Sequence, residues 1–196
     1  MSEQEDPYQT SVLLLKLVRS GEKSAWYRLV NIYTPLIVLW SRQHGMRGAD
    51  IEDITQNVFI AVEKHIEGFG NERAENSFRA WLWTITRSKI MDQLRLEKRN
   101  PITIGVQDLA RFESVGYNLD EERNASANEL KVLIAATLKF IRQDFSDQTW
   151  TAFWSTAALG QRPKEVASEL GMTAAAVCMC RARVLRRLRE TLRIEQ

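Results

Sequence analysis

QRPKEVASELGMTAAAVCMCRARVLRRLRETL, residues 161–192, decides the fold of the carboxy-terminal part of this chain. Pro163 suits the first turn of a helix, because its missing N–H has no partner there in any case. Gly171 fits the left-handed position that ends a helix, and Thr173 is a good N-cap for the next one. Two helices joined by so short a turn predict a helix-turn-helix, which sets its second helix into the major groove of DNA. A helical hairpin with an incidental turn is the alternative.

The second helix of this pair separates its apolar residues from its arginines. Apolar residues recur at spacings of seven, four and four and predict a buried stripe: Val177, Val184, Leu188 and Leu192. The first turns carry almost no hydrogen-bond donors, so a bidentate contact from arginine to guanine is excluded at positions 178 and 180. We therefore expect DNA readout through thymine-methyl contacts, DNA shape and phosphate anchoring. The candidate DNA-binding residues are Thr173, Ala174, Ala175, Cys178, Met179, Arg183, Arg186 and Arg187.

Charge is segregated along the chain, although the formal net charge over its 196 residues is only +2. Residues 79–99 contain six basic and two acidic side chains, and residues 101–130 contain two basic and six acidic ones. Residues 181–193 contain six arginines and one acid. Clustered cations release counterions from a phosphate backbone, which dispersed cations do not do. Two basic blocks around an acidic middle therefore favour a nucleic-acid partner, with solvated helix faces as the alternative.

Composition indicates an ordinary globular protein, with 44% hydrophobic and 27% charged residues. The longest apolar runs fall far short of the roughly 20 residues of a membrane span. The first ten residues are acidic and polar, unlike a secretory signal, and two closely spaced cysteines fit a reducing compartment. We expect a cytoplasmic protein without cofactor or metal, and we find no catalytic motif that would indicate an enzyme.

Periodicity predicts an all-α chain of two small helical domains. The first covers residues 1–100, the second covers residues 125–196, and the acidic segment 101–124 lacks periodicity and is predicted to be a linker. Helices are expected after Ser11, from Ser24 with an interruption or kink at Pro35, and from Asp50 with an approximate capping box to Asp53. Further helices are expected at about Ser77–Arg99, Ala125–Gln143, Asp147–Ala158, Pro163–Leu170 and Ala174–Leu192.

The helix expected from Asp50, DIEDITQNVFIAVEKHI, has one apolar and one polar face. Its apolar residues recur at spacings of three, four and four, as expected of a buried stripe. Ile60 lies on the opposite face with Asp53, Gln56 and Asn57, which indicates a protein–protein contact. A lone surface isoleucine without a partner is the alternative. The predicted stripe is Ile51, Ile54, Val58 and Val62.

The next helix, FRAWLWTITRSKIMDQLRLEKR, combines aromatic and basic side chains. Phe78, Trp81, Leu82 and Ile85 have the spacing of a core face. Trp83 falls off that face, near basic side chains, and stacking of bases on aromatic rings beside cations is how proteins bind single-stranded DNA. Packing in the core is the alternative for each tryptophan. The basic residues near Trp83 are Arg79, Arg87 and Lys89.

These two helices together resemble region 2 of a bacterial sigma factor of the extracytoplasmic-function (ECF) group, and residues 161–192 resemble region 4 of the same family. The resemblance implies an alternative sigma factor that binds core RNA polymerase and directs promoter recognition, DNA opening and transcription initiation. Two alternatives remain: a helix-turn-helix regulator that acts without core polymerase, and a sigma-like interaction protein that does not initiate.

The resemblance also implies roles for individual residues. Core polymerase would contact Asp50, Asp53, Gln56, Asn57 and Ile60. The opened −10 strand would contact the loop Phe69–Ser77 and the helix after it, through Asn71, Asn76, Arg79, Trp83, Arg87, Lys89, Asp92 and Arg95. The candidate DNA-binding residues of the second domain would recognise the −35 element of promoter DNA. A cognate anti-sigma factor is a further implied partner.

Overall fold

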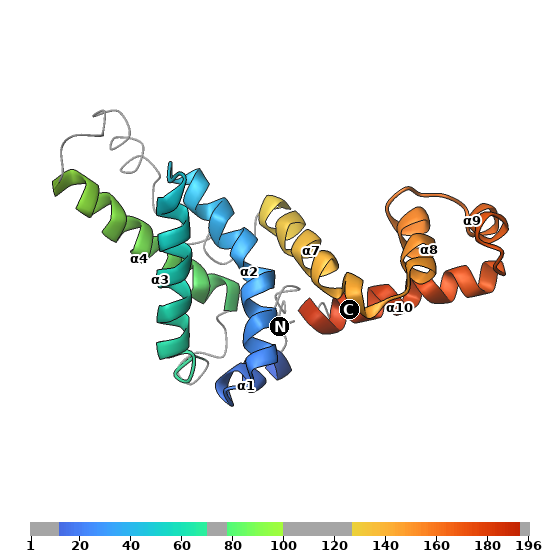
Figure 1. Cartoon of the computed structure of the whole chain (residues 1–196), viewed down its shortest axis with the longest axis horizontal. Coiled ribbons are helices and arrows are strands. Elements are labelled where there is room, and N and C mark those ends of the chain that lie inside the picture. The colour runs from blue at the N-terminus through green and yellow to red at the C-terminus, as the bar shows by residue number, and fades with distance from the viewer. Residues whose placement is uncertain (1–11, 70–77, 100–126, 193–196) are drawn as a thin grey trace, which may run out of the picture.

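The computed structural model describes residues 12–69, 78–99 and 127–192, and within these ranges the regular structure is helical (Figure 1). The predicted linker at residues 101–124 lies outside them, as do Asn71 and Asn76. The first group of helices is α1 (Val12–Arg19), α2 (Lys23–Gln43), α3 (Ala49–His65) and α4 (Phe78–Arg99). The second group is α7 (Ala127–Ile141), the 3-10 turn η1 (Arg142–Asp144), α8 (Asp147–Ala157), α9 (Pro163–Leu170) and α10 (Ala174–Leu192).

Helix α2 runs without interruption through Pro35, contrary to one expectation from the sequence. A proline inside a helix costs about 3 kcal/mol, because it removes one backbone hydrogen bond and crowds the preceding turn. Residues on both sides of it are buried in the same core: Ile32 and Tyr33 before it, and Leu36 and Ile37 after it. Burial of these large side chains offsets the cost and holds the two halves in one helix.

Helix α3 begins differently from the prediction, because Asp50 is not its N-cap. The N-cap is Gly48, whose φ of 50° is favourable for glycine and which offers no side-chain cap. Asp50 lies in the first turn instead, and its Oδ1 accepts a hydrogen bond from Nε2 of Gln93 at 3.0 Å. The predicted capping box is therefore wrong, and the Asp50 carboxylate links α3 to α4.

The first four helices pack around a common core. The stripe predicted on α3 is confirmed, since Ile51, Ile54, Val58 and Val62 are buried. Phe78 and Leu82 of α4 are also buried and so confirm part of the core face predicted for that helix. None of the helices in the described ranges is long and apolar enough to cross a membrane.

The helix-turn-helix is present as the sequence predicts. Helices α9 and α10 have the predicted bounds, and Gly171 between them adopts φ 63° and ψ 34°, the left-handed conformation. Thr173 caps α10, because its Oγ1 accepts a hydrogen bond from the backbone N–H of Ala176 at 3.1 Å. Helices α8, α9 and α10 share a small core of Ala152, Val166, Ala167, Val177 and Cys180.

Helix α7 lies beside α2 and joins the two groups of helices (Figure 1). Leu133 and Ile141 of α7, with Val184 and Leu188 of α10, belong to the same buried cluster as the core of α1–α4. Residues of both predicted domains therefore contribute to one continuous apolar core. This contact brings residues of the second group of helices onto the basic helix α4.

Candidate nucleic-acid interface

The outward face of α3 carries the residues predicted to contact a protein. Asp53, Gln56, Asn57 and Ile60 are all exposed, and the side chain of Ile60 is 41% accessible. Asp50 differs from them, because it is half-buried and bonded to Gln93. The structure thus brings four of the five predicted residues together on one open helix face.

Arg79 and Trp83, the predicted strand-binding residues nearest the start of α4, are covered. Arg79 is only 1% exposed, and its Nη1 donates to Oε2 of Glu129 on α7 at 3.1 Å. The half-buried ring of Trp83 packs against Trp40, with ring centroids 5.2 Å apart, and against His44 at 5.3 Å. In this arrangement Arg79 faces α7 and Trp83 faces α2.

The later turns of α4 are more open. Arg87 and Lys89 are half-buried, and Asp92 and Arg95 are exposed and form an ion pair at 3.3 Å. An exposed pair of this kind stabilises a helix by at most about 1 kcal/mol, so loss of the pair would cost the helix little. Among the predicted −10 residues in the described ranges, Arg79 is buried, three are half-buried (Trp83, Arg87 and Lys89), and Asp92 and Arg95 are exposed. Asn71 and Asn76 lie outside those ranges.

On α10 the predicted DNA-binding residues also divide. Ala175, Cys178, Met179, Arg183 and Arg186 are exposed, and Arg186 has Glu190 as a neighbour at 3.7 Å. Three others are engaged within the fold. Ala174 packs against the small core, Thr173 caps the helix, and Nε of Arg187 lies 2.9 Å from Oδ2 of Asp144.

Glu129 is a charged partner of the predicted site that sequence reasoning missed. Its two carboxylate oxygens accept separate hydrogen bonds, Oε1 from Nε1 of Trp40 at 2.7 Å and Oε2 from Arg79. In the sequence Glu129 is one acid of an acidic segment, and it sits in the first turn of α7, a common position for a solvated glutamate. Glu129 acquires its buried partners only because α7 packs against α2.

Arg28 of α2 marks a second charged contact between the two groups of helices. Burial lowers the pKa of its guanidinium below the ordinary value; nearby Arg187 lowers it further, whereas Asp144 and Glu190 raise it. Its Nε is buried and has no hydrogen-bond partner among the described residues. The environment of Arg28 therefore disfavours a positive charge at that position.

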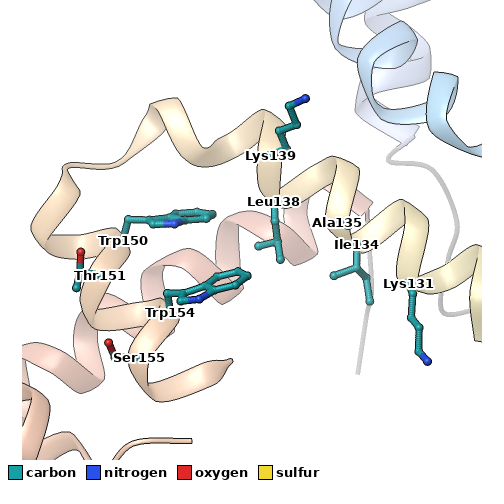
Figure 2. A pocket seen from close by; sticks show the side chains of 9 residues that line it. All are labelled: Lys131, Ile134, Ala135, Leu138, Lys139, Trp150, Thr151, Trp154 and Ser155. Atoms are coloured by element: carbon teal, nitrogen blue, oxygen red, sulfur yellow. The ribbon is translucent and has the colours of Figure 1, made fainter. Parts of the chain in front are cut away.

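An apolar groove lies between α7 and α8 (Figure 2). Trp150 and Trp154 of α8 face Ile134 and Leu138 of α7, and Trp154 is 44% exposed. The ammonium groups of Lys131 and Lys139 point away from its apolar floor, as Figure 2 shows.

In the described ranges no group of His, Cys, Asp and Glu side chains has the geometry to hold a metal ion.

Comparison with known proteins identifies the first group of helices. Residues 29–100 match the family model of sigma-70 region 2. The chain is 24% identical over 172 residues to the RNA polymerase sigma factor CnrH of Cupriavidus metallidurans, a match that covers 88% of each chain. It is 26% identical over 164 residues to the RNA polymerase sigma factor NccH of Alcaligenes xylosoxydans xylosoxydans, which covers 84% of each chain.

The matches to the two sigma factors extend over both groups of helices. The helix-turn-helix of α9 and α10 lies where the resemblance to region 4 predicts it. The family predicted from the sequence is therefore confirmed. The chain contains a sigma-70 region 2 domain and is similar, over more than four-fifths of its length, to two RNA polymerase sigma factors.

Proposed function

We propose that this alternative sigma factor binds core RNA polymerase through the outward face of α3 and recognises promoter DNA with α4 and α10. The observation that carries the proposal is the pairing of two exposed surfaces of different chemistry. Ile60 and its polar neighbours offer a protein-binding face, and the exposed arginines of α10 offer a phosphate-binding one.

The −10 element would be held by α4. Arg87, Lys89 and Arg95 supply cations along its accessible turns, and Trp83 supplies a ring for base stacking once its neighbours move. The predicted contributions of Asn71 and Asn76 stay predictions from the resemblance.

The −35 element would be held by α10, which the fold presents as the second helix of a helix-turn-helix. Arg183 and Arg186 are exposed and suited to phosphates, and Arg187 joins them when it leaves Asp144. The protein would act by binding and positioning rather than by catalysis. A cognate anti-sigma factor, predicted from the resemblance, would compete for these surfaces.

Transcription in vitro tests the proposal. The full chain is added to core RNA polymerase from a bacterium encoding it, with a library of genomic fragments as template, and initiated transcripts are mapped. Promoters with shared −10 and −35 elements, used only when the protein is present, are expected. The variant Ile60→Glu should abolish the transcripts, whereas Leu159→Glu, at a more exposed apolar position just after α8, should not.

The two other functions give different results in the same assay. A regulator that acts without polymerase would bind duplex DNA tightly by itself and would not co-purify with the polymerase. The apolar start of α10 favours a second candidate, a sigma-like protein that binds core polymerase but yields no transcript from any fragment.

A further inference from the structure

Glu129 ties α7 to two other helices at once. One carboxylate oxygen accepts from Trp40 on α2 and the other from Arg79 on α4, and both of these side chains are 1% exposed. A charge-assisted bond between buried groups is stronger than an exposed pair, because water does not compete for either partner. Removal of the Glu129 carboxylate takes away an opposite charge from the buried guanidinium of Arg79.

The contact extends along the whole length of α7. Leu133, Thr137 and Ile141 are at most 2% exposed and lie at successive turns of one face. At one edge the ring of Phe140 lies 6.4 Å from that of Tyr27 on α2. Beyond the end of α7, Asp144 engages Arg187 of α10 in the neighbourhood of Arg28. The two groups of helices thus share an interface with an apolar centre and charged ends.

This interface covers residues that the proposed function needs. An arginine that is 99% buried and bonded to a carboxylate does not reach a DNA phosphate, and the same packing confines Trp83 against Trp40. We propose that α7 is an intramolecular lid that covers Arg79 in the free protein and is held shut by Glu129. Helix α7 must leave α2 before the opened −10 strand binds to α4 at Arg79. The inference rests on the proposed function of α4 and on the predicted contact of Arg79 with the −10 strand.

The lid is tested first by a distance in the full-length protein. Fluorophores are attached to cysteines introduced by Lys64→Cys on α3 and Lys164→Cys on α9, both exposed, with Cys178→Ser to remove the exposed native thiol. Glu129→Ala should lower the energy transfer, and Glu129→Gln, which keeps one acceptor oxygen for Trp40, should lower it less. Glu63→Ala, which removes an exposed acid on α3, should leave the transfer unchanged. Unchanged transfer in Glu129→Ala overturns the lid.

Strand binding is the second readout. The probe is a labelled single-stranded oligonucleotide that spans the −10 element of a promoter found in the transcription assay. The apparent affinity of the protein for the strand equals the affinity of the open form multiplied by the fraction of molecules that are open. If one wild-type molecule in ten is open and Glu129→Ala opens all of them, the variant should bind the strand about tenfold more tightly. Equal affinities of Glu129→Ala and Glu63→Ala contradict a lid over the strand site. If Arg79→Ala leaves binding by the opened protein unchanged, the role of Arg79 fails while the distance result stands.

A separate observation concerns the specificity of α10. Ala175, Cys178, Met179 and Ala182 are all exposed, and Met179, at 63%, is the largest of them. Arginines follow within two turns, at Arg183 and beyond, so phosphate anchors flank an apolar surface. This surface offers no side-chain nitrogen or oxygen to the base edges.

Thymine is the base that presents an apolar group in the major groove, its 5-methyl. We infer that Met179, with Cys178 beside it, recognises 5-methyl groups in the −35 element, which deepens the proposed function of α10. A flexible, polarisable methionine suits such a contact because it adapts its shape to the methyl without needing a hydrogen bond.

Deoxyuridine tests this directly, because it differs from thymidine only by the missing methyl. Templates of an identified promoter carry deoxyuridine at single −35 positions, and initiation by the holoenzyme is measured. Wild-type protein should lose about three- to fivefold at the contacted position. Met179→Ala should initiate less from thymidine templates and lose this discrimination, whereas Leu159→Ala should keep it. Equal initiation from both templates at every position overturns the inference, and the absence of any promoter contradicts the proposed function instead.

Discussion

Nη1 of Arg79 and Oε2 of Glu129 lie 3.1 Å apart across the contact between α4 and α7, although the two residues are 50 positions apart in the sequence. The sequence predicts Arg79 as a DNA ligand and gives Glu129 no role. In the fold the two side chains form a shielded ion pair, with Arg79 1% and Glu129 14% exposed. The same arginine thus has an internal partner and a proposed external one.

Loss of one member of this pair should destabilise the closed protein. Arg79→Ala leaves the Glu129 carboxylate shielded with Trp40 as a donor, and Glu129→Gln leaves Arg79 without its carboxylate. Each single change is expected to lower the free energy of unfolding by up to about 3–5 kcal/mol. The loss is smaller if α7 moves away and lets water reach the remaining charge. Urea unfolding of both single variants and of the double variant Arg79→Ala/Glu129→Gln measures the coupling. Additive losses in the double variant would show that the pair is not coupled.

Arg28 is expected to be dispensable for stability. The lowered pKa means that the surroundings of the Arg28 guanidinium stabilise its charged form less well than water does, chiefly because of burial. Arg28→Met keeps the length of the side chain and removes the charge, and should leave the free energy of unfolding unchanged or raise it slightly. Arg42→Met, at an exposed site of the same helix, is the control. A clear loss of stability in Arg28→Met alone would contradict this reading.

Gly171 should resist substitution because of its backbone. At φ 63° a side chain is strained even though a β-carbon there would meet no atom within 4 Å. Gly171→Ala is expected to lower stability by about 1 kcal/mol, and to weaken duplex binding by misplacing α10. Thermal unfolding checks the first effect. Gly68→Ala, where the new β-carbon meets the His65 carbonyl oxygen at an ordinary 3.7 Å, should change stability less.

Salt should separate the two kinds of residue on α10. Arg183→Ala removes one exposed cation, so the affinity of the holoenzyme for promoter DNA should fall and the slope of log affinity against log salt should decrease by about one. Met179→Ala should lower affinity without a change of slope, because a methyl contact releases no counterion. Filter binding from low to moderate salt makes the comparison. Equal slopes for Arg183→Ala and wild type would remove Arg183 from the phosphate contacts.

Local signals predicted the helix-turn-helix well, since Pro163, Gly171 and Thr173 specify starts and stops within a few residues of themselves. The buried stripe of α3 was predictable for the same reason. The start of α3 was not, because Gly48 adopts a positive φ and frees Asp50 for a partner 43 residues away.

The covered state of Arg79 and Trp83 could not be predicted from periodicity. Periodicity reports which face of a helix is apolar, but not which distant helix lies on a mixed face. Trp83 and Arg79 lie off the apolar stripe of α4, and only their contacts with Trp40 and Glu129 show that this face is also occupied.

The separation of Arg79 and Glu129 also has a consequence for biosynthesis. A ribosome that adds about 5–20 residues per second needs roughly 3–10 s to proceed from one to the other. During the first part of that interval α4 itself is still being made, and α7 is not yet available to cover it. In every newly made molecule Arg79 is therefore in place before its partner Glu129, and the ion pair forms only after the second half of the chain has been translated.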